Sequence, residues 1–243
     1  MKILVISDIH ANLPALEAVL KAAGDIDAAW CLGDLVGYGP DPNECISIVR
    51  SLPNLICLLG NHDAAALGQI GIESFNLDAS LSALWTKKNL SADSYRYLQS
   101  LPQKQTASDK VELAHGSPRN PVWEYILDIY TARDNLDYFD TQLCLVGHTH
   151  LSLGYILSED ESHITLIQFQ DRDNMNLESR AILNPGSVGQ PRDHDPRAGF
   201  ALYYPDDNIW EAFRIKYDIR SVQKRIMDAG LPSSHAKRLS QGW

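Results

Sequence analysis

The sequence predicts an α/β fold with two packed β-sheets, and three observations support this class. Short, almost continuous apolar runs alternate with helical patterns over residues 2–59. From residue 111 onward, apolar runs follow one another closely, as the strands of hairpins do. No repeat, low-complexity tract or linker divides the 243 residues. We therefore expect residues 1–243 to form one domain.

The first half of the chain has the β-α-β-α-β order of a parallel sheet with right-handed crossovers. Strands are expected at 2–7, 28–32 and 55–59, and helices between Asn12 and Gly24 and at 43–51. Asn12 is placed as the cap of the first helix, with Pro14 in its first turn. The near-continuous apolar character of the strands is typical of a sheet covered on both faces.

Residues 64–101 show no strand pattern. They are expected to form a helical insert, with helices at 76–89 and 92–101. Strands are then expected at 111–114, 143–146, 151–157, 164–169, 180–183, 200–204 and 209–215, and the polar stretch 171–178 is expected to be a mobile turn. Two helices, at 219–229 and 234–241, complete the pattern. Because the segment after Asp218 carries no motif, we expect that it can be shortened without loss of chemistry.

Composition and charge exclude several classes of protein. The chain has 21 Lys and Arg against 31 Asp and Glu, a net charge of -10, so a general nucleic-acid-binding surface is not expected. No run approaches the ~18–20 apolar residues that a membrane-spanning helix needs, and no export signal is recognisable. The widely spaced cysteines are expected to be reduced and buried: Cys31, Cys45, Cys57 and Cys144. These features predict a cytoplasmic protein, and they indicate no particular oligomeric state.

Polar clusters directly follow five of the expected strands. They are Asp8-Ile9-His10, Gly33-Asp34, Gly60-Asn61-His62-Asp63, His115-Gly116 and Gly147-His148-Thr149-His150. Each cluster alone would be typical of a turn or of a buried histidine with ordinary hydrogen bonds. Ligands of open α/β sheets bind beyond the carboxyl ends of the strands, so we expect the five clusters to converge. Their Asp, His and Asn side chains suit Mn, Fe, Zn or Mg ions.

The five motifs resemble those of the calcineurin-like metallophosphoesterases, which read D-x-H, G-D, G-N-H-D/E, H and G-H-x-H. Here they appear in that order as DIH, GDLVGYGPDP, GNHD, HG and GHTH, over residues 8–150. The later segment NPGSVGQPR, residues 184–192, is similar to one in the small single-domain bacterial and archaeal branch. The resemblance implies a four-layer α/β/β/α sandwich of two mixed β-sheets flanked by helices.

The same resemblance implies a site with two divalent metal ions of the set Mn, Fe, Zn, Ni and Mg. By motif position, one ion is held by Asp8, His10 and His150, the other by Asn61, His115 and His148, and both are bridged by Asp34. Such a pair activates a water molecule that hydrolyses a small phosphodiester, phosphomonoester or nucleotide. His62, beside Asn61, is then the candidate to contact the phosphate and protonate the leaving oxygen. A turn histidine with a local hydrogen bond is the alternative interpretation.

The chain departs from the protein Ser/Thr phosphatase branch after the G-D motif. That branch has a second Asp and then an Arg where this sequence has Gly37 and Tyr38. His62 therefore lacks the usual carboxylate partner and the phosphate lacks an arginine from this loop, which favours the phosphodiesterase-like branch with small substrates. Arg192 is a candidate to replace that arginine at the substrate. The alternatives are a solvated loop residue or an ion-pair partner for Asp193 or Asp195.

Several other residues are open to two interpretations. Tyr38 and Trp123 are candidates to stack on a nucleobase or ordinary packing residues. His163 and His235 are expected at the surface. His194 is expected in a solvated loop, with a position in the wall of a cleft as the alternative.

Two further functions remain beside general phosphoester hydrolysis. The first is a more specific form of the enzyme hypothesis, a diadenosine-polyphosphate hydrolase. Some small members of the family are similar to such hydrolases. A catalytically silent interaction scaffold is the alternative from another class, since the fold has a relative in the retromer coat. Retention of both ligand sets and of His62 favours the enzyme.

Overall fold

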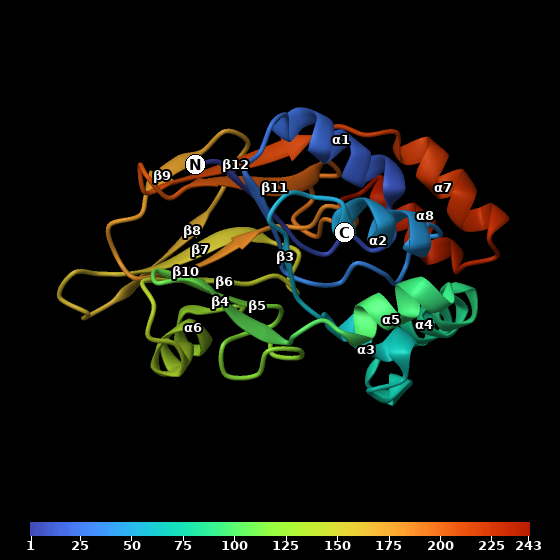
Figure 1. The fold of residues 1–243 in the computed structure, drawn as a ribbon, viewed down its shortest axis with the longest axis horizontal. Helices are drawn as coiled ribbons and strands as arrows, with labels where there is room; N and C mark the ends of the chain where they lie inside the picture. Colours follow the sequence, from blue (N-terminus) through green and yellow to red (C-terminus); the bar gives the residue numbers. More distant parts are fainter.

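Two six-stranded β-sheets lie face to face in the computed structural model, which describes residues 1–243 (Figure 1). The first sheet contains, in spatial order, β3 (Ile56–Cys57), β2 (Ala28–Cys31), β1 (Ile3–Ile6), β11 (Ala198–Tyr204), β12 (Ile209–Ile215) and β9 (Asn174–Asn176). The second contains β4 (Lys104–Ser108), β5 (Val111–Ala114), β6 (Leu143–Leu145), β10 (Ala181–Pro185), β7 (Ser152–Leu157) and β8 (Ile164–Gln168).

Helices lie outside the two sheets and at one end of the molecule. They are α1 (Leu13–Ala23), α2 (Pro42–Arg50), α3 (Asn61–Leu67), α4 (Leu77–Asn89), α5 (Ala92–Gln99), α6 (Ile129–Asn135), α7 (Ile219–Asp228) and α8 (Ser233–Leu239), with 3-10 turns at η1 (Ile72–Ser74) and η2 (Leu136–Tyr138). No helix has the combined length and apolar character that crossing a bilayer requires. The helical insert predicted for residues 64–101 is confirmed as α3 to α5.

The alternation of side chains along β1 connects two separate cores. Ile3 and Val5 point into the layer between the two sheets, where they join residues of both sheets such as Leu145. Leu4 and Ile6 point the other way and pack under the helices on the first sheet. Successive strand residues face opposite sides, so one apolar run of four buried residues fills both layers.

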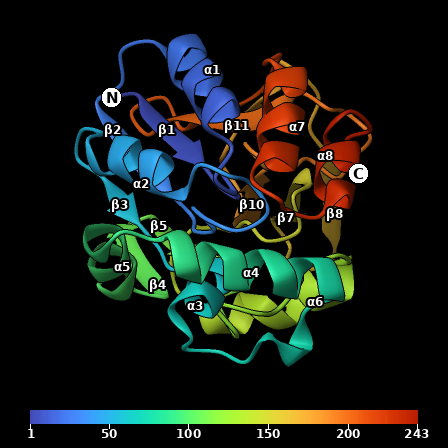
Figure 2. The ribbon, with the colours of Figure 1, turned by 90° about the vertical axis from the view of Figure 1, so that its right-hand side faces the viewer.

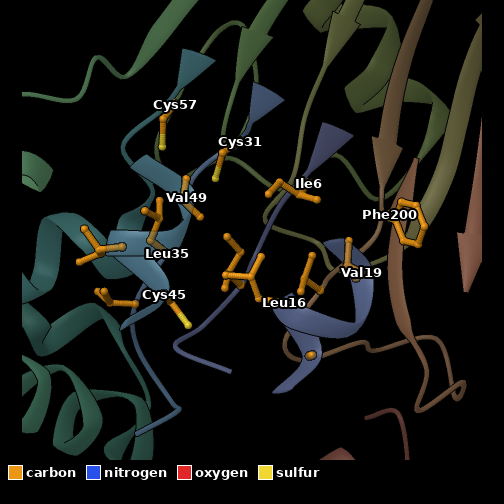
Figure 3. Packing of buried hydrophobic residues seen from close by; sticks show 14 of the residues in the cluster. Ile6, Leu16, Val19, Cys31, Leu35, Cys45, Val49, Cys57 and Phe200 are labelled. Carbon is orange, nitrogen blue, oxygen red and sulfur yellow. The ribbon is translucent and has the colours of Figure 1, made fainter. Parts of the chain in front are cut away.

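The outer faces of both sheets are covered by helices, which makes four layers. Figure 3 shows Ile6 beside Leu16 and Val19 of α1, with Phe200 of β11 close by. On the outer face of the second sheet, Ala132 of α6 belongs to another buried apolar cluster. The four-layer α/β/β/α sandwich implied by the resemblance is therefore confirmed.

Strand direction brings the polar motifs to one end of the sandwich. β1, β2 and β3 are parallel neighbours in the first sheet, and β5, β6 and β10 are parallel neighbours in the second. The other pairings are antiparallel, so both sheets are mixed. The five motifs follow β1, β2, β3, β5 and β6 at their carboxyl ends.

The elements that were not predicted from the sequence include three short and mostly polar ones, β9, β4 and α6. The expected turn at 171–178 is wrong in part, because it contains the edge strand β9, which pairs with β12. β4 is likewise an edge strand with mostly exposed side chains, and α6 has only seven residues. Edge strands bury few side chains and so lack the apolar periodicity on which prediction depends. Asp128 caps α6 by accepting hydrogen bonds from Tyr130 and Thr131 amides.

The last two helices are tied to the helical insert. Trp85 Nε1 of α4 donates a hydrogen bond to the carbonyl oxygen of Ala229 (3.0 Å), and Ser234 of α8 hydrogen-bonds to Asp78 of α4. Figure 2, which looks at this end of the molecule, shows α4 beneath α7 and α8. The terminal segment is therefore part of the packed structure.

We expect Leu145→Ala to lower the free energy of unfolding by about 2–5 kcal/mol, because Leu145 is fully buried between the sheets. Leu166→Ala on β8 removes the same atoms from a side chain that is 48% exposed, and should change stability by no more than about 0.5 kcal/mol. Urea unfolding followed by circular dichroism measures both. Equal losses would contradict the placement of this core.

Candidate metal centre

The structure brings six of the predicted ligands together as two buried groups. Asp8, His10 and His150 form the first, and Asp34, His115 and His148 form the second. Within each group, the candidate ligand atoms all lie within 4.8 Å of one another. The groups come from both sheets, so the centre lies where the carboxyl ends of the two sheets meet.

The backbone at these residues adopts a conformation that L-residues rarely use. Five of the six have positive φ angles: Asp8 (54°), His10 (50°), Asp34 (54°), His148 (64°) and His150 (62°). Left-handed residues other than glycine each carry a conformational cost and persist only where surrounding contacts hold them. Their concentration here indicates that the loops are shaped to aim side chains into one site.

The segment 184–190 supplies many of the contacts that hold these loops. Ser187 Oγ donates a hydrogen bond to the carbonyl oxygen of Asp8 (2.8 Å), and Gly189 N donates to the same oxygen (2.9 Å). Asn184 Nδ2 donates to the carbonyl oxygen of Gly147 (2.7 Å). The NPGSVGQPR segment, known from the sequence only by resemblance, thus connects the D-x-H and G-H-x-H loops.

His10 and His150 face each other with unprotonated nitrogens. Their Nδ1 atoms lie 3.0 Å from the carbonyl oxygen of Val36 and 2.5 Å from that of Gln190, and since a carbonyl only accepts, each Nδ1 carries the proton. Burial lowers the pKa of His10 to about 3 and that of His150 well below its usual range. Two Nε2 lone pairs therefore lie 3.2 Å apart, an arrangement that suits a cation close to both.

Asp34 is positioned between the two groups. Its Oδ1 accepts a hydrogen bond from the amide of His62 (2.8 Å). Its Oδ2 is buried without a hydrogen-bond partner, 3.8 Å from His10 Nε2 and 3.4 Å from His115 Nε2. Burial opposes ionisation of Asp34, but the neighbouring His115 and His62 rings outweigh it, so its pKa lies below the usual range. A free carboxylate oxygen at this point fits a bridging ligand.

Asp8 and His115 complete the electrostatics of the centre. Asp8 Oδ1 is also buried without a hydrogen-bond partner and lies 3.3 Å from His150 Nε2. Burial raises the pKa of Asp8 to about 6, with Asp34 adding to the rise and His115 opposing it. Burial works against charge on His115, but Asp34 dominates and raises its pKa to about 9. In the absence of metal, the carboxylates therefore attract a proton to His115.

Asn61 extends the second group, because its Oδ1 lies 3.1 Å from His115 Nε2. His148 Nε2 lies 3.2 Å from the carbonyl oxygen of Trp123, which leaves Nδ1 as the nitrogen free to bind an ion. Burial lowers the pKa of His148 to about 3, so its ring is neutral. The donor set of carboxylate, imidazole and amide groups, with two orphaned carboxylate oxygens, fits two divalent cations.

His62 lies beside the centre, and its Nδ1 has no hydrogen-bond partner, as expected from the missing carboxylate. Burial lowers its pKa well below the usual range, although Asp34 partly opposes this shift. Gly37 explains why position 37 of that loop places no carboxylate beside the ring. Its φ is +90°, and a Cβ there would lie 2.7 Å from His62 Nδ1. The space that a side chain at residue 37 would need is occupied by the His62 ring.

Arg192 is not an ion-pair partner of Asp193 or Asp195. Asp193 pairs with Arg214, and Asp195 with Arg197. The Arg192 guanidinium instead donates through Nη2 to Tyr38 Oη (3.3 Å) and Gln190 Oε1 (3.2 Å). The structure therefore excludes an ion pair of Arg192 with Asp193 or Asp195, and it places the arginine beside the metal centre.

The aromatic candidates lie close to the centre. Tyr38 packs against the His62 ring, with centroids 4.4 Å apart, and Trp123 packs against Phe75 at 5.2 Å. His163 and His194 are exposed as expected.

The expectation that His235 is exposed is wrong, because it is 2% exposed and packs edge-on against Tyr38. The sequence pattern marks α8 as a surface helix, but its buried face lies against the site. The terminal segment therefore lies against the site, and the expectation that it can be shortened without loss of chemistry stays a prediction.

Asp63 was missed as a contributor to the site. It is fully buried, and its two oxygens accept hydrogen bonds from the amides of Val36 and Gly60, both at 3.0 Å. Burial, reinforced by Asp34, raises its pKa to about 7. It joins the G-D loop to the start of α3. An acid at the third position of a helix is a capping signal that the sequence did contain.

Comparison with known proteins agrees with this geometry. The sequence matches the calcineurin-like phosphoesterase superfamily domain over residues 1–208. An uncharacterized protein of Methanocaldococcus jannaschii is 37% identical over 246 residues, which cover 99% of this chain and 98% of that protein. A symmetrical bis(5'-nucleosyl)-tetraphosphatase of Pectobacterium atrosepticum is 30% identical over 140 residues, which is 55% of this chain and 49% of that protein.

A solved structure extends the likeness over the whole chain. The crystal structure of a metallophosphoesterase from Sphaerobacter thermophilus is similar with a TM-score of 0.92 at 45% identity, covering 100% of this chain and 99% of that one. Residues that match the superfamily domain include both candidate ligand groups and Asp34. The chain therefore belongs to the calcineurin-like phosphoesterase superfamily.

Proposed function

We propose that this protein hydrolyses a small phosphoester at a centre of two divalent metal ions, with residues 1–243 acting as one domain. The observation that supports this most is the placement of Asp34 Oδ2, which is buried and unpartnered between two groups of ligand atoms. Asp8, His10 and His150 hold one ion in this proposal. Asn61, His115 and His148 hold the other.

Asp8, His10, His150, Asp34, Asn61, His115 and His148 would hold the two cations, from the set Mn, Fe, Zn, Ni and Mg. Such ions would supply Lewis acidity to the phosphoryl group and lower the pKa of the attacking water. The protein's own contribution is rigid placement. Val36 and Gln190 carbonyls fix the rings of His10 and His150, and the low pKa of His10 keeps that ring neutral and able to bind an ion. Buried surroundings exclude water and strengthen each charge interaction.

His62 has the role of contacting the phosphate and assisting the leaving oxygen. It is 4% exposed and faces a cavity that Asn61 and Arg192 also line. A phosphoester anion in that cavity stabilises the protonated ring, which burial alone disfavours. His62 then donates its proton to the oxygen that departs from phosphorus.

A dinucleoside polyphosphate is the second candidate substrate, favoured by the tetraphosphatase relatives that align with about half of the chain. Chromatographic analysis of diadenosine tetraphosphate after incubation with the metal-loaded protein tests this version. The general proposal is tested with bis(p-nitrophenyl) phosphate and each of the five metals, against a chelator control. Absence of hydrolysis with every metal would favour the scaffold alternative.

We expect Asp34→Asn to reduce turnover at least about 100-fold and to lower the metal content at both sites, because the bridging charge is lost. Elemental analysis of the purified protein measures occupancy independently of activity. Asp207→Asn is the matched control, since Asp207 is exposed in the turn between β11 and β12. Two bound ions with normal turnover in Asp34→Asn would contradict the bridging role.

We expect His62→Ala to slow hydrolysis of alkyl or nucleoside esters by about 10²–10⁴-fold, and that of p-nitrophenyl esters much less. A nitrophenolate leaves without a proton, whereas an alkoxide needs one. Steady-state rates on both ester classes, with metal content measured alongside, test this role. His163→Ala, at an exposed histidine, is the control. Equal losses on both classes would assign His62 to phosphate binding alone.

A further inference from the structure

A cavity of about 150 Å³ opens beside the candidate metal centre on the side of His62. Its walls include Asn61 and His62 from the centre, Phe75 and Trp123 from neighbouring segments, and two arginines, Arg192 and Arg238. Because a water molecule occupies about 30 Å³ in the liquid, the cavity has room for several waters or for one phosphate group. It lies where the leaving group of a phosphoester would be placed if His62 assists it.

Neither arginine of this cavity forms an ion pair with an aspartate or glutamate side chain. Arg192 donates to the neutral Tyr38 hydroxyl and to the Gln190 side chain, and its Nε is buried without a hydrogen bond. Arg238 Nε donates to the main-chain oxygen of Trp243 (2.7 Å). Asp78 is the acid that acts on Arg238 from α4, and its side chain is already hydrogen-bonded to Ser234.

Two like charges at one cavity carry an electrostatic cost. Burial lowers the pKa of Arg238, and repulsion from Arg192 adds to the shift. Arg192 interacts favourably with the carboxylate of Asp8, because its charge favours ionisation of that group. When two divalent cations bind the carboxylates of the centre, the cations neutralise their negative charge, and Arg192 loses this favourable interaction. An anion in the cavity would then be bound by both guanidiniums.

We propose that Arg192 and Arg238 form a second anion subsite, which binds a further phosphate group on the leaving-group side of the substrate. This inference rests on the proposed function and narrows it to esters or anhydrides whose leaving group itself carries a phosphate. Water forms the new bond to phosphorus and loses one proton to the solvent, and the bond from phosphorus to the leaving oxygen breaks. That oxygen keeps the electron pair and takes the proton of His62, while the arginines hold the phosphate attached to it.

The terminal segment of the chain contributes one of the two arginines of the subsite, Arg238. The match to the superfamily domain ends at residue 208, and Arg238 lies beyond it, on α8. His235 on the same helix packs against Tyr38, which also accepts the hydrogen bond from Arg192. The helix thus places its arginine through buried contacts with the site itself.

The test compares two probes on the metal-loaded protein by titration calorimetry: methylphosphonate, with one phosphonate group, and methylenediphosphonate, whose P–C–P link resists hydrolysis. We expect Arg238→Ala to weaken binding of methylenediphosphonate by about 10- to 100-fold, the value of hydrogen bonds to a charged group, and to affect methylphosphonate far less. Arg192→Ala should give the same selective loss. Arg238→Lys keeps the positive charge and should lose less affinity for methylenediphosphonate than Arg238→Ala does.

Lys237→Ala is the matched control, because it removes the same charge from an exposed neighbour on the same helix and should leave both affinities unchanged. Metal content after titration excludes chelation, and thermal unfolding establishes that the variants fold. A diphosphonate preference that survives in both arginine variants would overturn the subsite. Turnover of bis(p-nitrophenyl) phosphate by the parent protein tests the proposed function separately, and a selective loss in Arg238→Ala supports the subsite even if that turnover is absent.

Discussion

A single buried carboxylate, that of Asp34, is the interaction on which the rest of the site depends. One oxygen is fixed by the amide of His62 at the start of α3, and the other is left free between two groups of imidazoles. The charge of Asp34 sets the direction of the pKa shift of His115 and contributes to that of Asp63. Gly60 is required beside it, because a Cβ there would lie 2.0 Å from Asp34 Oδ1. The carboxylate thus determines both the electrostatics and the local packing.

The loops around this carboxylate are held by main-chain hydrogen bonds from a distant segment. The strained backbone of Asp8 is secured by Ser187 and Gly189, and the loop at Gly147 by Asn184. Hydrogen bonds of this kind are individually modest, but a buried donor or acceptor left without a partner is costly. The unfavourable conformations at the metal loops are therefore stabilised by a segment that contributes no ligand in the proposed site.

Much of the fold and of the candidate site was predictable because buried strands leave strong signals. The apolar runs at β1, β2 and β6 and the polar motifs after them indicated both the sheets and the point where the motifs meet. What the sequence did not indicate depends on contacts between distant residues. The burial of His235 comes from the packing of α8 against Tyr38, and the freedom of Arg192 comes from Arg214 and Arg197 taking the neighbouring acids. β9 was missed because an edge strand has no buried periodicity.

The pairing of His10 with His150 has a consequence for the order of assembly. The two rings are separated by 140 residues in the chain and belong to loops of different sheets. Each ligand group combines residues that are far apart in the sequence. A cation therefore cannot organise a short segment of the unfolded chain, as the zinc ion of a zinc finger does. The sheets must close this long loop first, and contacts of such separation form late and slowly. The proposed ligand set therefore exists only once the two sheets have come together, and it is a product of folding rather than its starting point.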